Sequence, residues 1–255
     1  MSGASSKATT NTKKAYPPWN WFEALCVAIL AMVGVGALLG LLIGGMGAVL
    51  KNTPFDISSI IKLLESGSIT ANFIFYSISR LIALGLIYIL LRRRKVSLKE
   101  FGFRKFSLKK ALLTLLASLA LMVIGTIVVM VIVAILYPNI DLEQSQDIVF
   151  KNAVNVPQIL MAFVALVIIA PVAEESIFRG LLLPAFAKKI GFVGAAIITS
   201  IMFGAVHGQL NVAIVTFVLG LLLAWMYKST NSLWPAIILH SLKNLIAFLL
   251  IYLKI

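Results

Sequence analysis

Long apolar runs separated by short polar segments dominate the chain. A helix needs roughly 20 apolar residues to cross the hydrocarbon core of a bilayer, and about seven windows, within a range of six to eight, approach or exceed that length. They lie at about 22–50, 69–91, 110–136, 157–186, 192–207, 210–228 and 232–252. The windows lack the polar stripes that a soluble helical bundle needs. The pattern therefore predicts an all-α polytopic membrane protein.

The composition supports this fold class. Hydrophobic residues make up 61% of the 255 positions and charged residues only 12%, whereas a soluble domain is about half apolar and a quarter charged. The formal net charge of +13 is concentrated in a basic loop at 92–110, between the second and third windows. Basic loops between spans mark the cytoplasmic side of a membrane. We therefore expect the N-terminus to be cytoplasmic.

The distribution of charge also indicates that the basic residues face a membrane and do not bind a nucleic acid. Arg179, Lys188 and Lys228 fall on the predicted inner side, and the acidic segment at 141–147 falls on the outer side. This alternation agrees with the placement of the basic loop. We expect the lipid bilayer to be the partner of the basic residues, and no binding of nucleic acid.

Three regions follow from the distribution of polar and apolar segments. Residues 1–21 are predicted to form a disordered basic tail, with Trp19 and Trp21 near the membrane interface. Residues 22–150 form an N-terminal transmembrane module, and residues 151–255 a helical core that carries the candidate site. Cys26 is the single cysteine, so a disulfide framework is excluded.

Ionisable residues inside the later windows form the candidate site. Insertion of such a residue costs about 2.5–3.5 kcal/mol, so its presence in a span is a hypothesis of function. At a rise of about 1.5 Å per residue, Glu174, His207 and Asn244 all lie roughly 18–22 Å from the inner edge, and His240 about 12 Å from it. Three windows thus bring polar groups to one slab near the midplane, where the helices are expected to enclose an intramembrane polar site.

Spacing assigns different surroundings to the two adjacent glutamates. Glu175 and Arg179 are one helical turn apart and can form an ion pair. Glu174 points about 100° away from Glu175 and has no cation at helical spacing. One carboxylate is therefore expected to be compensated and the other left available as a base. Pro171, just before them, is expected to kink the helix and to free a carbonyl group.

The chemistry of these residue types favours hydrolysis. A carboxylate with a histidine can activate a water molecule, which Glu174 and His207 could do. His240 and Asn244 share a helical face and can donate hydrogen bonds to an oxyanion, while Phe203 shares the face of His207. Each residue alone could be structural, and zinc held by Glu174, His207 and His240 is an open alternative. The sequence lacks an HExxH motif, so we expect no metal and no other cofactor.

Three motifs in order resemble those of a known family. "EESIFR" at 174–179, "FGAVH" at 203–207 and "HSLKN" at 240–244 are similar to the EExxxR, FxxxH and HxxxN/D motifs of the CPBP intramembrane proteases. This family is also called the Abi or CAAX-protease-like family. The resemblance covers about residues 170–247.

The resemblance implies a glutamate-dependent intramembrane endopeptidase in a bacterial cell membrane. Glu174 and His207 would activate water, His240 and Asn244 would form the oxyanion hole, and Glu175, Arg179 and Phe203 would support the site. The substrate would be a peptide or a membrane-associated protein, with a lipidated C-terminus as one option. Two alternatives stay open, namely a non-catalytic immunity or partner protein of the bacteriocin self-immunity type, and a transporter with a midplane ion site.

Overall fold

The computed structural model describes residues 17–54, 56–138 and 149–253. The tail at 1–16 and the predicted outer acidic segment, with Asp141, Glu143 and Asp147, lie outside these ranges. Throughout the described ranges the regular structure is helical, with no β-strand. The elements are α1 (Trp21–Ile29), η1 (Leu30–Gly34), α2 (Val35–Leu50), α3 (Ser58–Glu65), α4 (Ile69–Arg93), α5 (Leu98–Phe101), α6 (Leu108–Leu136), η2 (Val149–Asn152), α7 (Val156–Phe163), η3 (Val164–Ile169), α8 (Ala170–Glu175), η4 (Ser176–Leu182), α9 (Leu183–Ala205), α10 (Leu210–Thr230) and α11 (Leu233–Leu253).

Six continuous helical segments of the described chain are long and apolar enough to cross a membrane. The fourth, Val156–Ala205, has 50 residues, far more than one crossing needs. Its backbone leaves the helical conformation at Gly191, where φ is 73° and ψ is 169°. The fourth and fifth windows of the sequence are therefore two helices joined at this glycine. The prediction of an all-α polytopic membrane protein is confirmed.

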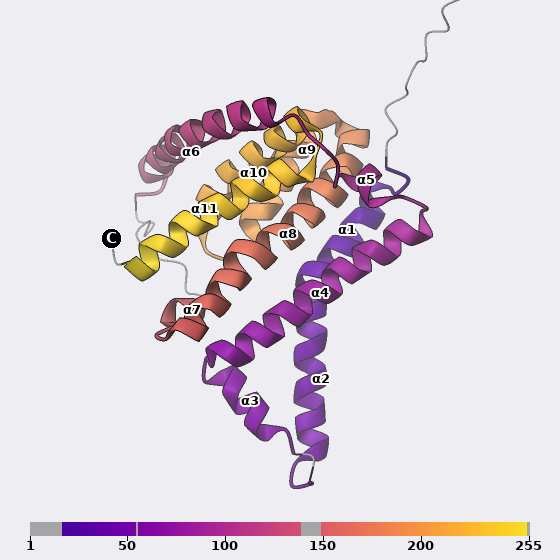
Figure 1. Ribbon diagram of the computed structural model, residues 1–255, viewed down its shortest axis with the longest axis vertical. Helices are drawn as coiled ribbons and strands as arrows, with labels where there is room; N and C mark the ends of the chain where they lie inside the picture. Colours follow the sequence, from indigo (N-terminus) through magenta and orange to yellow (C-terminus); the bar gives the residue numbers. More distant parts are fainter. Residues whose placement is uncertain (1–16, 55, 139–148, 254–255) are drawn as a thin grey trace, which may run out of the picture.

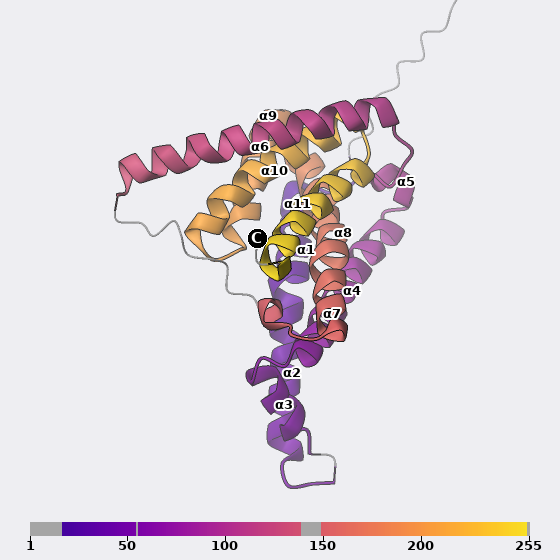
Figure 2. The ribbon, with the colours of Figure 1, turned by 60° about the vertical axis from the view of Figure 1, so that its left-hand side comes forward.

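The helices of the second half form the packed part of the molecule. Helix α10 contacts α6, α9 and α11, while α11 also packs on η3 and α8. Figure 1 shows α8, α10 and α11 running next to one another, and Figure 2 shows α6 crossing over α10. Helix α2 diverges from α4, and α3 joins them at the end furthest from this bundle (Figure 1). Buried side chains concentrate where α8, η4, α9, α10 and α11 meet.

Basic residues from separate elements meet at one end of the bundle, which we call the basic end. Arg94, at the end of α4, forms a salt bridge of 2.7 Å with Glu23 of α1. The ammonium group of Lys189 lies 4.4 Å from the centre of the Trp21 ring, and that of Lys228 lies 4.9 Å from the Phe192 ring. The elements that the charge pattern assigned to one side of the membrane are thus neighbours in space.

The start of the described chain differs from the prediction. Trp19 is 2% exposed, and its indole nitrogen donates a hydrogen bond to the Leu181 carbonyl. Asn20 accepts a hydrogen bond from the backbone of Glu23 and so caps α1. The predicted disordered tail is therefore too long, because residues 17–21 are held by the protein. Trp19 packs inside the bundle and does not form part of an interfacial aromatic belt.

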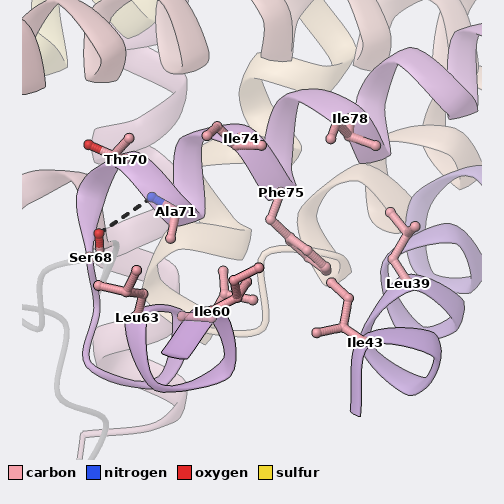
Figure 3. Close-up of a pocket in the computed structure, with 11 residues that line it drawn as sticks. Leu39, Ile43, Ile60, Leu63, Ser68, Thr70, Ala71, Ile74, Phe75 and Ile78 are labelled. Carbon is pink, nitrogen blue, oxygen red and sulfur yellow. Dashed lines mark hydrogen bonds between the residues drawn. The ribbon is translucent and has the colours of Figure 1, made fainter. Parts of the chain in front are cut away.

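An apolar pocket of 370 Å³ lies where α2, α3 and α4 diverge. Figure 3 shows Ile60 and Leu63 of α3 opposite Ile74, Phe75 and Ile78 of α4, with Leu39 and Ile43 of α2 closing one side. None of its lining residues belongs to the candidate site. The pocket has the lining expected of a lipid-facing recess between spans.

Glycines allow α9 and α10 to approach closely. A Cβ atom added at Gly204 would lie 2.6 Å from the Ala213 carbonyl oxygen. One added at Gly220 would lie 2.8 Å from the Cβ of Ser200. Small residues at helix contacts are the usual route to tight packing in membranes, where no hydrophobic force draws helices together. This contact fixes the position of α9, which carries Phe203.

We predict that Gly204→Ala destabilises the protein by about 1–3 kcal/mol, because the added methyl group meets backbone atoms that cannot rotate away. Thermal unfolding of the detergent-solubilised protein measures the change. Gly40→Ala is the matched control, since Gly40 has open space around its Cβ position. Equal melting temperatures for the two variants would contradict the close packing of α9 against α10.

Candidate active site

A buried ion pair lies at the centre of the candidate site. Glu175 ends α8, and Arg179 lies in the π-helix η4 that follows it. The Arg179 Nη1 donates to Glu175 Oε1 over 3.0 Å, and the two side chains are 1% and 0% exposed. The predicted i,i+4 pair is therefore present, and it is fully enclosed by protein.

Arg179 also joins α8 and η4 to the neighbouring helices. Its Nη2 donates to the Gly220 carbonyl of α10 over 2.9 Å. Its guanidinium carbon lies 4.6 Å from the centre of the Phe203 ring of α9, within the range of a cation–π contact. Gly220 thus serves twice, since its missing side chain admits α9 and its carbonyl binds Arg179.

His240 of α11 bridges the two glutamates. Its Nδ1 lies 3.0 Å from Glu175 Oε1. Arg179 donates to the same carboxylate, and an ionised carboxylate only accepts, so Nδ1 carries the hydrogen. Its Nε2 faces Glu174 Oε2 at 3.8 Å. The ring is thereby oriented with one nitrogen on the compensated glutamate and the other on its neighbour.

Phe203 brings the two histidines to one aromatic cluster. Its ring centre is 5.3 Å from that of His207 and 5.6 Å from that of His240, in edge-on contacts. His207 follows the end of α9, and its Nδ1 lies 2.8 Å from the Phe203 carbonyl. A carbonyl can only accept, so this Nδ1 is also protonated. His207 therefore keeps Nε2 free of this backbone bond.

The two glutamates differ in accessibility. The side chain of Glu174 is 12% exposed, whereas that of Glu175 is 0% exposed. Glu174 interacts electrostatically with His207 and Lys243 as well as facing His240. Of the two carboxylates, Glu174 is the one that a substrate or a water molecule can approach.

Asn244 is held by a carbonyl that the helix leaves free. Its Nδ2 donates to the Leu166 carbonyl of η3 over 2.9 Å. Hydrogen bonds in η3 skip five residues, as from the Ala170 N–H to the Ala165 carbonyl. In that register Leu166 would accept from residue 171, but Pro171 has no N–H. The carbonyl that proline was expected to free is thus bound by a predicted site residue.

Comparisons with known proteins find two matches to the part of the chain that carries the candidate site. The family described as "Type II CAAX prenyl endopeptidase Rce1-like" matches residues 156–246. A Bacillus subtilis (strain 168) protein named "Putative membrane peptidase YdiL" is 34% identical over 77 residues. The aligned part covers 30% of this chain and 32% of that relative, so the chain spans about a third of the relative's length.

Both matches support the resemblance of this region to the CPBP family. The matched residues contain every member of the site described above, from Glu174 to Asn244. No solved structure gives a significant match to the chain.

The candidate site also receives residues from α4, which the sequence interpretation missed. Helix α4 packs against α8, and Tyr76 of α4 interacts electrostatically with Glu174. The guanidinium carbon of Arg80 lies 5.0 Å from the Tyr76 ring centre. Arg80 falls inside an apolar window, which makes it a functional candidate by the same rule as Glu174. Arg80 lies in the second window, and the sequence prediction of the site was confined to the later windows.

The described residues contain no group of three or more histidine, cysteine, aspartate or glutamate side chains arranged to hold a metal ion. Glu174 and His240 are close, but His207 contacts them only through the Phe203 ring and through electrostatic interaction.

We predict that Asn244→Ala destabilises the protein by about 1–3 kcal/mol, since it leaves the partly buried Leu166 carbonyl without this donor. Adding Pro171→Ala supplies an N–H at position 171 and should recover most of that stability. Thermal unfolding of the single and double variants measures the effect, with Pro171→Ala alone as the control. If the changes in stability of the two substitutions simply add, the N–H at position 171 does not replace Asn244 as the donor to Leu166. That result would contradict the prediction.

Proposed function

We propose that the chain is an intramembrane endopeptidase that hydrolyses a peptide bond at Glu174. The supporting observation is that the two glutamates differ in their partners and in their exposure. Glu175 is compensated by Arg179 and His240, while Glu174 faces the second nitrogen of His240 and is partly exposed. An available carboxylate held beside an oriented imidazole is the arrangement that a general base needs.

In this proposal Glu174 takes a proton from a water molecule, which then attacks the substrate carbonyl. His207 assists through its Nε2, because Nδ1 is bonded to the Phe203 carbonyl. The proton taken by the base is later delivered to the leaving amine, as microscopic reversibility requires. A positioned acid or base of this kind contributes about 10²–10⁴-fold to a rate.

His240 and Asn244 are proposed to stabilise the oxyanion. They lie one turn apart on α11, so both side chains project from one face. His240 would donate from Nε2 in its imidazolium form, with Nδ1–H kept on Glu175, and Asn244 would donate the amide hydrogen that does not bind Leu166. Removing one oxyanion donor from an acyl-transfer enzyme costs about 10²–10³-fold in rate. Glu175, Arg179 and Phe203 position these groups and do not react.

The substrate is proposed to be a peptide or a membrane-associated protein, with C-terminal lipidation as one option. The basic end is proposed to face the cytoplasm of a bacterial cell, which places the N-terminus inside. No metal or other cofactor takes part in this proposal.

We predict that Glu174→Gln and His207→Ala each lower the rate of peptide hydrolysis by at least about 100-fold. The measurement is cleavage of a fluorogenic peptide by the detergent-purified full chain, with and without a chelator. Glu65→Gln is the matched control, since it removes an exposed carboxylate on α3 and should keep the wild-type rate.

Equal rates in all variants would contradict the proposal. Loss of wild-type activity with the chelator, restored by zinc, would replace the metal-free mechanism. A protein without hydrolytic activity whose Glu174→Gln variant still protects cells against a bacteriocin would favour the immunity alternative.

A further inference from the structure

We propose that a cavity at the basic end binds the phosphate group of an anionic phospholipid. The cavity measures 630 Å³ and is bounded by α5, η4, α9, the end of α10 and the start of α6. It contains none of the residues assigned to hydrolysis, although its Gly180 and Leu183 lie on the helical segment that follows the glutamates. This is therefore a second site, independent of the proposed peptidase.

The cavity has an excess of positive charge. Arg104, Lys110 and Lys228 line it from three separate segments, against one carboxylate, that of Glu100. The Oε2 of Glu100 accepts hydrogen bonds from the Ser97 hydroxyl and backbone, at 2.7 and 2.8 Å. These bonds belong to a capping box for α5 and lower the pKa of Glu100. The three cations thus face the cavity without a dedicated counterion there.

The loop that carries Arg104 is fixed in place. The Gly102 carbonyl accepts from the Leu233 N–H over 2.9 Å, and the Arg104 carbonyl accepts from the Ser232 hydroxyl over 2.7 Å. Gly102 has a φ of 140°, and a Cβ there would lie 2.8 Å from Leu233 Cγ. The guanidinium Nε of Arg104 is buried and has no hydrogen-bond partner among the described residues. The loop therefore holds the Arg104 guanidinium, which also forms a hydrogen bond with Tyr227, at the wall of the cavity.

The start of α6 adds a second reason for an anion. Lys109 and Lys110 lie in its first turn, where the helix dipole disfavours positive charge. The Ser107 hydroxyl already accepts from the Lys110 N–H, so a phosphate in the cavity would act on the Lys110 side chain, which lines it. Placing basic residues at a helix start has a physical benefit when an anion is bound nearby.

The remaining walls favour a lipid over a free ion. Trp19, Phe101, Leu183 and Phe192 line the same cavity, so an apolar surface continues from the cationic groups. A lipid headgroup carries a glycerol unit and chains that such a surface can bury, whereas inorganic phosphate has none. The cavity also lies at the ends of candidate spans, at the depth where headgroups gather.

Retention of phosphatidylglycerol by the full chain, measured by native mass spectrometry from detergent, tests this proposal. Lys110→Gln with Lys228→Gln removes two lining charges. Lys105→Gln with Lys109→Gln is the matched control, because these exposed lysines are neighbours that do not line the cavity. We expect the first pair to weaken retention at least about tenfold and the control pair less than about twofold. Phosphatidylcholine should be retained weakly by all three proteins.

Three outcomes decide the proposal. Equal weakening by both pairs, with both variants folded by circular dichroism, would mean general surface attraction and would overturn it. Equal retention of phosphatidylcholine would overturn it as well. Displacement of the lipid by millimolar inorganic phosphate, lost in the first pair alone, would overturn the lipid as the ligand and indicate an anion site for free phosphate.

Discussion

The burial of one negative charge among membrane-spanning helices is the constraint on which the rest of the site depends. Glu175 has no exposed surface, and a buried carboxylate without a partner is strongly destabilising. It is compensated by Arg179 on the next turn and by His240 of α11. Arg179 in turn binds α10 through Gly220 and contacts Phe203 of α9. Five helical elements, α8, η4, α9, α10 and α11, are thus joined around a single carboxylate.

This compensation explains how two adjacent glutamates can have different roles. Consecutive residues on a helix point about 100° apart, so one side chain enters the core while the other reaches a partly open face. The groups that neutralise Glu175 also orient His240 towards Glu174. Phe203 then places His207 beside the same group of residues. A structural ion pair and a candidate base are therefore parts of one arrangement.

The sequence predicted the features that depend only on residues near one another in the chain. Apolar run length located the spans, and i,i+4 spacing located the Glu175–Arg179 pair. It could not predict that Phe203 contacts both histidines or that Asn244 binds Leu166, because these contacts depend on helix packing and on the π-helical register of η3. Trp19 was misplaced for a related reason. The surrounding residues, Pro17, Pro18 and Asn20, give no periodic apolar pattern, yet the Trp19 indole is buried and bonds to Leu181 of η4.

Nitrogen NMR of the histidines tests the central claim most directly, since the chain contains only two. The account predicts that both rings carry a hydrogen on Nδ1, His240 bonded to Glu175 and His207 to the Phe203 carbonyl. A His207→Gln variant assigns the remaining signals to His240. Glu175→Gln should then shift the His240 signals and leave those of His207 in place. Unchanged His240 signals in the folded variant would contradict the account.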